Sequence, residues 1–446
     1  MNIKDFAKRL LDKAIEKGFS DAEVYLSNGT SFSVQTLNGE IEKYQNSASR
    51  GVSFRGSYKD KMGYSYSEWI DDGAIDIIIT EAMQNSEILE EEEQDKLFRD
   101  YENEKYSEVC AFSQDLQNIS IEDKINAAFA MENSAKSVNE AIKSVDHNGV
   151  SYGEGSTLIM NTYGLRLEHK SNSASGYSYA RAVKDGETKT GGEYWHGLKW
   201  NEFSPEEIGG IAGREAISKF GAKQVKSEKY KVVMKNTAFA SLFSVFTSVI
   251  LADTAQKGLS LLAGKLNEKI ASDIFTLRDD PIYPDLAWSV SFDSEGVATY
   301  NKAVIENGVF KTFLHNIKTA AKDGIKSTGN ASGGYRSPIR VSPKNLYVVP
   351  GSVTLNELIK QAGGGLYITD LAGLHSGANS VSGDFSLLAE GYLIENGEIG
   401  KPVEQITVAG NFFDLLKDIE NIADDLRFTS IGSPAVLIGG LNVAGE

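Results

Sequence analysis

Residues 22–44, AEVYLSNGTSFSVQTLNGEIEKY, decide the fold class because apolar and polar side chains alternate along them. Alternation with a period of two is typical of a half-buried strand. Two Asn-Gly pairs, Asn28-Gly29 and Asn38-Gly39, punctuate the pattern, and this dipeptide supplies the positive φ angles of a tight hairpin turn. The stretch therefore predicts consecutive β-hairpins, and residues 51–68, GVSFRGSYKDKMGYSYSE, are expected to continue the sheet.

Strands and turns dominate much of the remaining chain. Residues 151–200 are strand-like and contain the turn signal Asp185-Gly186, residues 229–235 (KYKVVMK) predict a strand, and Asn307-Gly308 and Asn396-Gly397 predict two later hairpins. Helices are predicted where apolar residues recur at helical spacing between capping and stop signals. They are expected over residues 3–17, 73–86, 120–143, 205–220, 237–257, 354–361 and 411–422.

The length of the chain predicts two domains. Its 446 residues exceed what one ordinary hydrophobic core supports. Residues 221–229, GAKQVKSEK, are polar and lysine-rich, and we place the boundary there. The expected fold class is α+β, with hairpin-rich β-sheets and packed helices. An N-terminal α+β domain would span residues 1–225, and a β-rich C-terminal domain would span residues 226–446.

Charge and cysteine usage exclude several classes of protein. The chain carries 45 basic and 62 acidic residues, a net charge of −17, which opposes direct nucleic-acid binding. The acidic run 87–95 is typical of a solvated helix face or loop. One cysteine, Cys110, excludes an internal disulfide framework and a Cys-rich zinc site. The N-terminus lacks the apolar region of a signal peptide, and the longest apolar stretch, 238–252, is too short to span a bilayer. We expect a cytoplasmic protein that makes no contact with membranes.

Familiar catalytic motifs are missing from the sequence. It contains no P-loop, no dinucleotide-binding glycine fingerprint and no Gly-x-Ser-x-Gly nucleophile elbow. Its five histidines lie more than 20 residues apart along the chain: His147, His169, His196, His315 and His375. A zincin motif needs two imidazoles on one helix beside a glutamate, so no local zinc site is predicted. A site assembled from distant histidines stays open, although a surface or hydrogen-bonded role is favoured for each.

Acidic residues next to turn formers are the remaining candidates for catalysis. Asp279-Asp280-Pro281 and Asp293-Ser294-Glu295-Gly296 are both typical of turns. Asp384, in the segment SGDFS, is expected to cap or brace a loop. Catalytic roles for these carboxylates stay open.

Several segments together resemble the PmbA/TldD family. They are residues 264–281, 292–310, 319–331, 342–359 and 365–416, with the N-terminal block 22–42 and GVSFRG at 51–56. The segment 365–416 carries the strongest family signature. Its residues Asn379, Gly383, Asp384, Asn396, Gly397 and Asn411 fall where the family pattern expects them.

The resemblance implies a zinc-dependent peptidase that acts inside the cell on unfolded or flexible peptides and is built from two related subunits. In the TldD-type subunit, a central helix carries His-Glu-x-x-x-His and a C-terminal cysteine adds a further ligand. In this chain, the motif positions hold Phe243, Ser244 and Ser248, and the C-terminal segment has no cysteine. Phenylalanine and serine cannot supply these ligands or this base, so the resemblance points to the PmbA (TldE) type, with no catalytic residue and no metal in this chain.

The sequence of the motif helix agrees with a packing role. Its apolar residues form a stripe at i, i+3, i+4 and i+7 spacing, namely Phe239, Leu242, Phe243, Phe246, Val249 and Ile250. Such a stripe is expected to pack in a core, or otherwise in a subunit interface. Phe243 and Phe246 are therefore predicted to be buried.

The leading hypothesis is a non-catalytic subunit that completes the substrate cleft of a TldD-type zinc peptidase, with the zinc in that partner. An extended peptide could add as a strand to an exposed sheet edge, and the isolated chain could form a homodimer. Two alternatives stay open. The chain could be a stand-alone regulatory or binding protein of the DNA gyrase modulator type, or an independent hydrolase with an unrecognised site.

Overall fold

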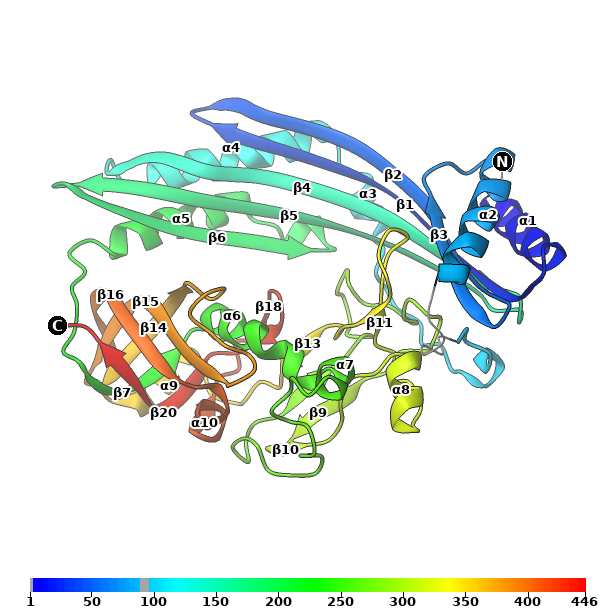
Figure 1. Ribbon diagram of the computed structural model, residues 1–446. Coiled ribbons are helices and arrows are strands. Elements are labelled where there is room, and N and C mark those ends of the chain that lie inside the picture. The colour runs from blue at the N-terminus through cyan, green and yellow to red at the C-terminus, as the bar shows by residue number, and fades with distance from the viewer. Residues whose placement is uncertain (1–2, 89–95) are drawn as a thin grey trace. The chain divides into compact units, whose positions relative to one another are not determined.

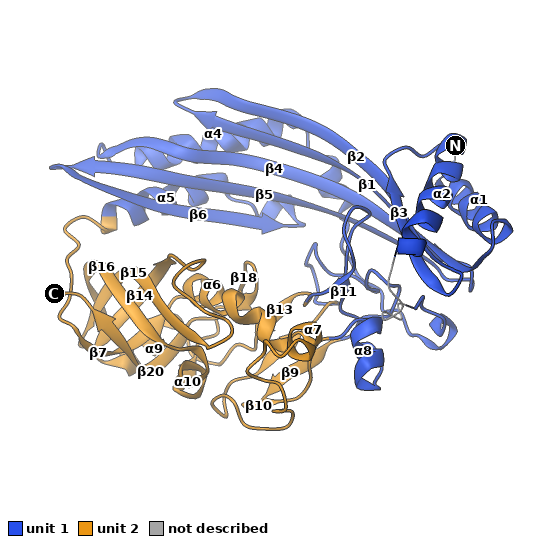
Figure 2. Cartoon of the chain, in the orientation of Figure 1, with its two compact units in different colours: residues 1–217, 282–300, 315–342 blue, residues 218–281, 301–314, 343–446 orange. Residues whose placement is uncertain are grey.

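The computed structural model describes residues 3–88 and 96–446. Most of the acidic run 87–95 lies outside these described residues. The chain divides into two compact units, shown in Figure 2. Unit 1 comprises residues 1–217, 282–300 and 315–342, and unit 2 comprises residues 218–281, 301–314 and 343–446. Both units combine helices with sheets, so the predicted α+β class is confirmed.

The first crossing between the units, at residues 217–218, lies just before the predicted boundary segment 221–229. The sequence predicted two contiguous domains, 1–225 and 226–446. It did not indicate that residues 282–300 and 315–342 pack with unit 1. Their separation from the rest of unit 1 along the chain explains the difference, because local composition marks linkers and cannot show which distant segments pack together.

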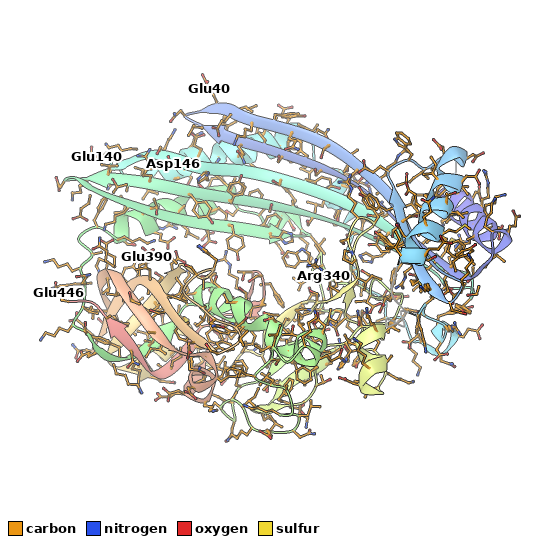
Figure 3. The ribbon with its side chains drawn as sticks, viewed as in Figure 1. Glu40, Glu140, Asp146, Arg340, Glu390 and Glu446 are labelled. Carbon is orange, nitrogen blue, oxygen red and sulfur yellow. The ribbon has the colours of Figure 1, made fainter. Side chains whose placement is uncertain are left out.

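A long antiparallel sheet forms the centre of unit 1, with strand order β3-β2-β1-β4-β5-β6. Its strands are β1 Phe19–Leu37, β2 Glu40–Tyr58, β3 Lys61–Ser67, β4 Ile142–Asn161, β5 Arg166–Lys184 and β6 Glu187–Gly197. The turns at Asn38-Gly39 and Asp185-Gly186 are confirmed, and all four residues have positive φ. Figure 3 labels Glu40, the first residue of β2 after the first of these turns, and Asp146 on β4.

The turn predicted at Asn28-Gly29 is wrong. β1 runs straight through both residues, which pair with Arg50 and Ser49 of β2 on one side and with Ser156 and Gly155 of β4 on the other. Neither Asn28 nor Gly29 has a positive φ. Backbone pairing along both edges of a long strand outweighs the local turn preference of one dipeptide.

Helices cover the face of the sheet to which Val24, Leu26, Phe32 and Val34 of β1 contribute buried side chains. α1 Ile3–Glu16 and α2 Asp72–Ile88 pack at one end of the strands, while α4 Ile121–Ser137 and α5 Pro205–Ser218 lie along the other end (Figure 1). These helices confirm the predictions at 3–17, 73–86 and 205–220. The predicted helix 120–143 is too long, because Asn139 forms a turn by accepting a hydrogen bond from the N–H of Ala141 at 2.9 Å, and β4 then begins at Ile142.

Short elements complete unit 1. They are η1 Tyr101–Asn103, α3 Gln114–Gln117, η2 Trp200–Glu202, α8 Ile317–Asp323, β11 Ala331–Ser332 and β12 Arg340–Val341. β11 pairs antiparallel with β12, and Arg340 of β12 is labelled in Figure 3. The last three of these elements belong to residues 315–342.

Two sheets organise unit 2. In one, the strand order is β16-β15-β14-β7-β20-β17, and an additional pairing of β16 with β20 closes the sheet on itself. The other has the order β10-β9-β8-β13-β19-β18. The strands are β7 Glu228–Met234, β8 Leu277–Asp279, β9 Lys302–Glu306, β10 Val309–Phe310, β13 Leu346–Val348, β14 Gly365–Ala372, β15 Asp384–Glu395, β16 Glu398–Asn411, β17 Ile419–Ile422, β18 Arg427–Phe428, β19 Gly432–Ser433 and β20 Val436–Ala444. The predicted strand 229–235 and the turns at Asn307-Gly308 and Asn396-Gly397 are confirmed.

The helices of unit 2 are shorter than predicted in two places. α9 Leu355–Ala362 confirms the prediction at 354–361, but the helix expected over 411–422 is α10 Phe412–Lys417 followed by strand β17. The helix expected over 237–257 is split into α6 Asn236–Phe246, η3 Thr247–Ile250 and α7 Ala252–Gln256. The N–H of Leu314 bonds to the carbonyl of Ile250, and the N–H of Ala252 to the carbonyl of Leu314, which draws Leu251 into an extended conformation.

Candidate functional site

The family motif positions fall on α6 and on the turn that follows it. Phe243 is 2% exposed, and its ring lies 5.1 Å from that of Phe412 and 6.3 Å from that of Phe275. Phe246 stacks on Phe412 at 4.2 Å between ring centroids. The predicted burial of Phe243 and Phe246 is therefore confirmed.

The residues present at this position do not fit a zinc ion. Phe243 offers a hydrocarbon ring packed among aromatics, and Ser244 Oγ donates a hydrogen bond to the backbone carbonyl of Ser241 at 2.7 Å. Ser248 has a neutral hydroxyl, whereas protein zinc sites use imidazole, thiolate or carboxylate ligands. In the part of the chain that the structure describes, no group of three or more His, Cys, Asp or Glu residues could hold a metal ion.

The histidines lie in separate surroundings. His196 stacks on Trp288 with ring centroids 4.3 Å apart, and His169 meets the edge of Phe292. His315 is buried, with Nε2 4.0 Å from Asp323 Oδ2, and burial lowers the pKa of its imidazole. These contacts give His196, His169 and His315 packing or hydrogen-bonding roles.

Four of the six family-signature residues meet at one loop in unit 2. Asn379 Oδ1 accepts from the N–H of Val381 and Ser382, and its N–H bonds to the carbonyl of Asp384. Asn411 Nδ2 donates to Asp384 Oδ1 at 3.0 Å, and Asn411 also caps α10. Gly383 has φ 85° and sits so close to Asn411 that an added Cβ would lie 2.9 Å from its Nδ2.

This loop supports the aromatic cluster on α6, because Asn411 begins the helix whose Phe412 stacks on Phe246. Asp384 therefore braces a loop, as the sequence suggested. The other two signature residues, Asn396 and Gly397, form the turn between β15 and β16. The signature residues therefore fix the conformation of one loop and one turn in unit 2.

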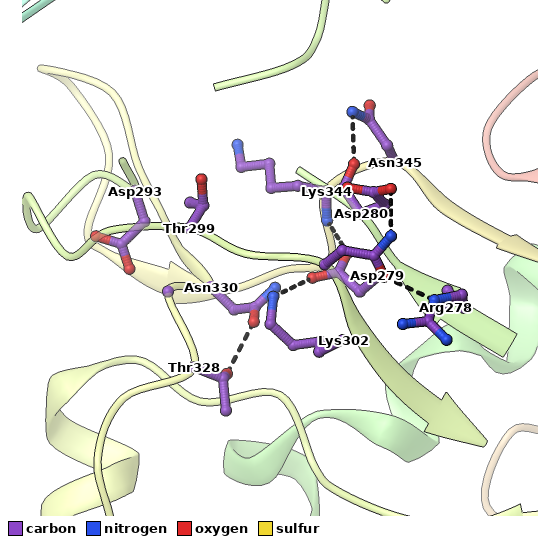
Figure 4. Close-up of polar contacts among 12 residues, drawn as sticks. Arg278, Asp279, Asp280, Asp293, Thr299, Lys302, Thr328, Asn330, Lys344 and Asn345 are labelled. Atoms are coloured by element: carbon purple, nitrogen blue, oxygen red, sulfur yellow. Dashed lines mark hydrogen bonds and ion pairs between the residues drawn. The ribbon is translucent and has the colours of Figure 1, made fainter. Parts of the chain in front are cut away.

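A buried ion pair lies in unit 2 where the sequence predicted a simple turn. Asp279 is the last residue of β8 and is fully buried. Lys302 Nζ donates to Asp279 Oδ2 at 2.9 Å, and the N–H of Lys344 donates to Oδ1 at 2.5 Å (Figure 4). Asn301 Nδ2 donates to Asp280 Oδ2. These bonds hold together three segments that are distant in the sequence, so both carboxylates have structural roles.

A second buried charge cluster surrounds a cavity of about 430 Å³ within unit 1. Glu23 on β1 lies directly opposite Arg55 on β2, and Arg55 Nε donates to Glu23 Oε1 at 2.7 Å. Both side chains point away from the helix-covered face, because they alternate with the buried residues Val24 and Phe54. This polar face of the strands forms one wall of the cavity.

Residues 282–300 and 315–342 supply the opposite wall. Glu295 is 3% exposed, and its Oε1 lies 3.6 Å from Arg55 Nη1. Its Oε2 accepts the N–H of Ile317, the first residue of α8, at 2.8 Å. The predicted turn is confirmed, since Asp293 Oδ1 accepts from the N–H groups of Glu295 and Val297. This turn aims the Glu295 carboxylate at Arg55.

The two carboxylates share the Arg55 guanidinium, and the electrostatic balance is unfavourable for both. Burial raises the pKa of Glu295 to about 8, with repulsion from Asp293 and Glu23 adding to the shift and Arg55 opposing it. Burial also raises the pKa of Glu23. Two buried acids beside one guanidinium disfavour double ionisation, so a proton or another cation is needed to balance the cluster.

This cavity was not predicted from the sequence. Polar residues alternating with buried ones at 22–26 and 52–56 indicated a polar sheet face, and Glu23 and Arg55 belong to it. Nothing local showed that residue 23 pairs with residue 55, or that the turn at 293–296 packs against both. The cluster depends on strand register and on chain segments far apart in the sequence.

Comparison with known proteins places this fold among the metallopeptidase-type proteins. Three family models match, described as PmbA/TldA metallopeptidase domain 1 at residues 22–86, central domain at 114–220 and C-terminal domain at 227–445. The chain belongs to the PmbA/TldD family, as the resemblance implied. None of the helices in the described ranges is long and apolar enough to cross a membrane.

Similar proteins cover almost the whole chain. Metalloprotease PmbA of Escherichia coli O157:H7 is 26% identical over 98% of this chain and 97% of its own length. The crystal structure of a candidate modulator of a DNA gyrase from Thermotoga maritima MSB8 is 34% identical, with a TM-score of 0.93 over 99% of this chain and 100% of that one. TldE from Thermococcus kodakarensis, at 22% identity and a TM-score of 0.91 over 99% and 100%, shares the fold.

Proposed function

We propose that this protein is a non-catalytic, PmbA/TldE-type subunit of a zinc peptidase complex that acts on unfolded or flexible peptides in the cytoplasm. The observation that carries the proposal is the packing of α6. The position expected to present the first zinc-binding imidazole holds Phe243, which packs against Phe275 and Phe412. The catalytic zinc and its general base would belong to a TldD-type partner subunit.

Membership of the family supports the peptidase context, and curated relatives bear the name metalloprotease. In the proposed complex this chain completes the peptide-binding cleft. The edge strands β3 and β6 of the unit 1 sheet offer backbone groups to which an extended peptide could add as a further strand. Without its partner, the chain could form a homodimer. We propose no direct contact with nucleic acid, in keeping with the acidic net charge.

The test is hydrolysis of an unstructured peptide by this chain alone, by the TldD-type subunit of the same cell alone, and by both together. The mixture should cleave at least tenfold faster than either subunit. Full activity of this chain alone would refute the proposal, as would a partner whose rate does not change when the chain is added.

Two neighbouring substitutions sharpen the experiment. Phe243→Asp should abolish the stimulation, because it places an unpaired charge in a packed aromatic cluster. Ser244→Ala is the matched control on the same helix turn. It removes only the bond from Ser244 Oγ to the Ser241 carbonyl and should leave stimulation unchanged, since no proton transfer depends on that hydroxyl. Loss of stimulation in Ser244→Ala would contradict the prediction that this hydroxyl is dispensable.

A second candidate is a stand-alone regulatory protein. The similar structures from Thermotoga maritima and Bacteroides thetaiotaomicron are described as candidate modulators of DNA gyrase. Purification of the chain from its native cell distinguishes the candidates. Recovery of a chain that carries His-Glu-x-x-x-His favours the peptidase complex, whereas recovery of gyrase without such a chain favours regulation.

A further inference from the structure

The charge cluster of unit 1 places two buried carboxylates beside one guanidinium. Arg55 is bonded to Glu23 at 2.7 Å and lies 3.6 Å from Glu295, so one guanidinium faces two buried carboxylates. Glu23 is 2% exposed. Among residues 3–88 and 96–446, Oε2 of Glu23 has no hydrogen-bond partner, although the Asn161 side chain lies near enough to favour its ionised form. A buried carboxylate oxygen without a partner is costly.

The lining of the cavity beside these carboxylates is both polar and apolar. Glu23 and Arg55 on the strands and Glu295 on the opposite wall provide charged groups, with Lys318 of α8 also lining the space. Met62, Pro338 and Ile339 contribute the apolar surface. A volume of about 430 Å³ falls in the range of small-molecule sites, which typically combine apolar lining with a few polar groups that fix orientation.

We propose that this cavity binds the ammonium group of a small amine against Glu23 and Glu295, with an apolar side chain of the ligand packed on Met62, Pro338 and Ile339. A free apolar amino acid and the N-terminal residue of a short peptide share this chemistry. The inference does not depend on the proposed subunit role, because every residue that carries it lies in unit 1.

A single ammonium fits better than the other ions. Calcium takes six to eight oxygen ligands and magnesium an octahedral set, whereas this cavity offers two carboxylates that already face the Arg55 guanidinium. An anion would be repelled by two buried acids. A primary ammonium has three donors, which suffices for the unpartnered Glu23 oxygen and for Glu295.

Binding should displace a proton. Burial raises the pKa of Glu295 to about 8, so at neutral pH this side chain is largely protonated before an ammonium arrives. The charged groups around it are Arg55 and Glu23 on the strands, Asp293 in its own turn and Lys318 on α8, and the titratable phenols of Tyr25 and Tyr64 also line the cavity. The ammonium favours the ionised carboxylate, so the proton leaves to solvent.

Calorimetric titration of the full chain at pH 7 tests the proposal with leucinamide, leucyl-leucinamide and N-acetyl-leucinamide. The two ligands with a free amine should bind, and the acetylated one should bind at least tenfold more weakly. A preference for leucyl-leucinamide identifies a peptide terminus, and a preference for leucinamide identifies a ligand of a single residue. The heat should also change between buffers of different ionisation enthalpy, which reports the released proton.

Variants separate binding from folding. Glu23→Gln and Glu295→Gln should each weaken leucinamide binding at least tenfold, while Glu40→Gln, at the exposed first residue of β2, should bind like the wild type. Gly334→Phe adds bulk at the cavity wall without changing a charge, and its Cβ would meet nothing closer than Ser337 Oγ at 3.8 Å. It should also weaken binding.

Three outcomes would overturn the proposal. The first is no binding of either free amine at millimolar concentration, and the second is equal binding of leucinamide and its acetylated form. The third is binding of isovalerate in place of leucinamide, strengthened by Glu295→Gln, which would define an anion site. A thermal melt of each variant without ligand shows whether it is folded, and Gly334→Phe keeps the test valid if a glutamine variant fails to fold.

Discussion

The two buried charge clusters differ in their balance. In unit 2, Asp279 and Lys302 form a pair of opposite charges 2.9 Å apart, and the backbone N–H of Lys344 satisfies the other carboxylate oxygen. In unit 1, Glu23 and Glu295 share Arg55, and burial raises the pKa of both acids. In the first cluster every charge has a partner within the protein. In the second, two acids share one base, so a bound proton or a cationic ligand group can complete the balance. Balance, more than burial, separates a structural cluster from a candidate binding site.

The largest effect is expected where the balanced pair is broken. Lys302→Met leaves the fully buried Asp279 carboxylate without its cation, which should lower the free energy of unfolding by about 3–5 kcal/mol. Denaturant titration followed by circular dichroism measures the change. The double variant Asp279→Asn with Lys302→Met removes both charges and should recover most of the loss. A Lys302→Met protein as stable as the wild type would contradict a structural role for the pair.

An effect that depends on pH, and is smaller for each pH unit, is expected in the unbalanced cluster. The pKa of Glu295 is about 8 in the folded protein against an ordinary value of 4.5, so the folded state holds a proton that the unfolded chain releases. The free energy of unfolding therefore falls as pH rises from 5 to 8, by at most about 1.4 kcal/mol per pH unit. Glu295→Gln should reduce this slope, because the Glu295 carboxyl no longer titrates, while Glu23, whose pKa burial also raises, remains beside Arg55, Asp293 and Lys318.

Denaturant titrations at pH 5, 6, 7 and 8 measure that slope, with Glu40→Gln as the exposed control that should keep it. Identical slopes in Glu295→Gln and the wild type would show that the carboxylate does not titrate in this window. The two clusters would then be alike in their response to pH, and the contrast between them would disappear.

The smallest effect is expected at an exposed pair. Lys199 Nζ lies 2.8 Å from Asp285 Oδ2, and both side chains are about half exposed. Water screens such pairs, and the entropy of ordering two long side chains offsets their attraction. Lys199→Met should give an unfolding curve that overlays the wild type. A clear loss of stability would show that pairing matters even without burial.

The sequence predicted the parts of the fold that depend on local pattern. The stripe of Phe239, Phe243 and Phe246 indicated a buried helix face, and the turns at Asn38-Gly39 and Asn396-Gly397 follow from the backbone preferences of those residues. Predictions were wrong where distant contacts prevail. Asn28-Gly29 is held extended by partners on both sides, and the helix beyond Phe246 is interrupted through Leu314.

The candidate sites also differ in whether the sequence alone could locate them. The family resemblance located Phe243, Ser244 and Ser248 because those positions follow one another along the chain. The cavity of unit 1 requires β1 to pair with β2 in one register and the turn around Glu295 to pack on that pair. Single residues such as Glu23 carry no local mark of this arrangement, so only the folded chain reveals it.

The division of unit 1 into separated segments has a consequence for protein synthesis. Residues 315–342, which supply one wall of the cavity, leave the ribosome only after residues 218–281 and 301–314 of unit 2. Unit 1 therefore cannot finish folding while it is the only part of the chain that has been made. The nascent protein must carry two incomplete units at once until residue 342 of 446 has emerged, which exposes unfinished apolar surface to aggregation. A fragment that stops at residue 225 would lack Glu295 and would present Glu23 and Arg55 to water.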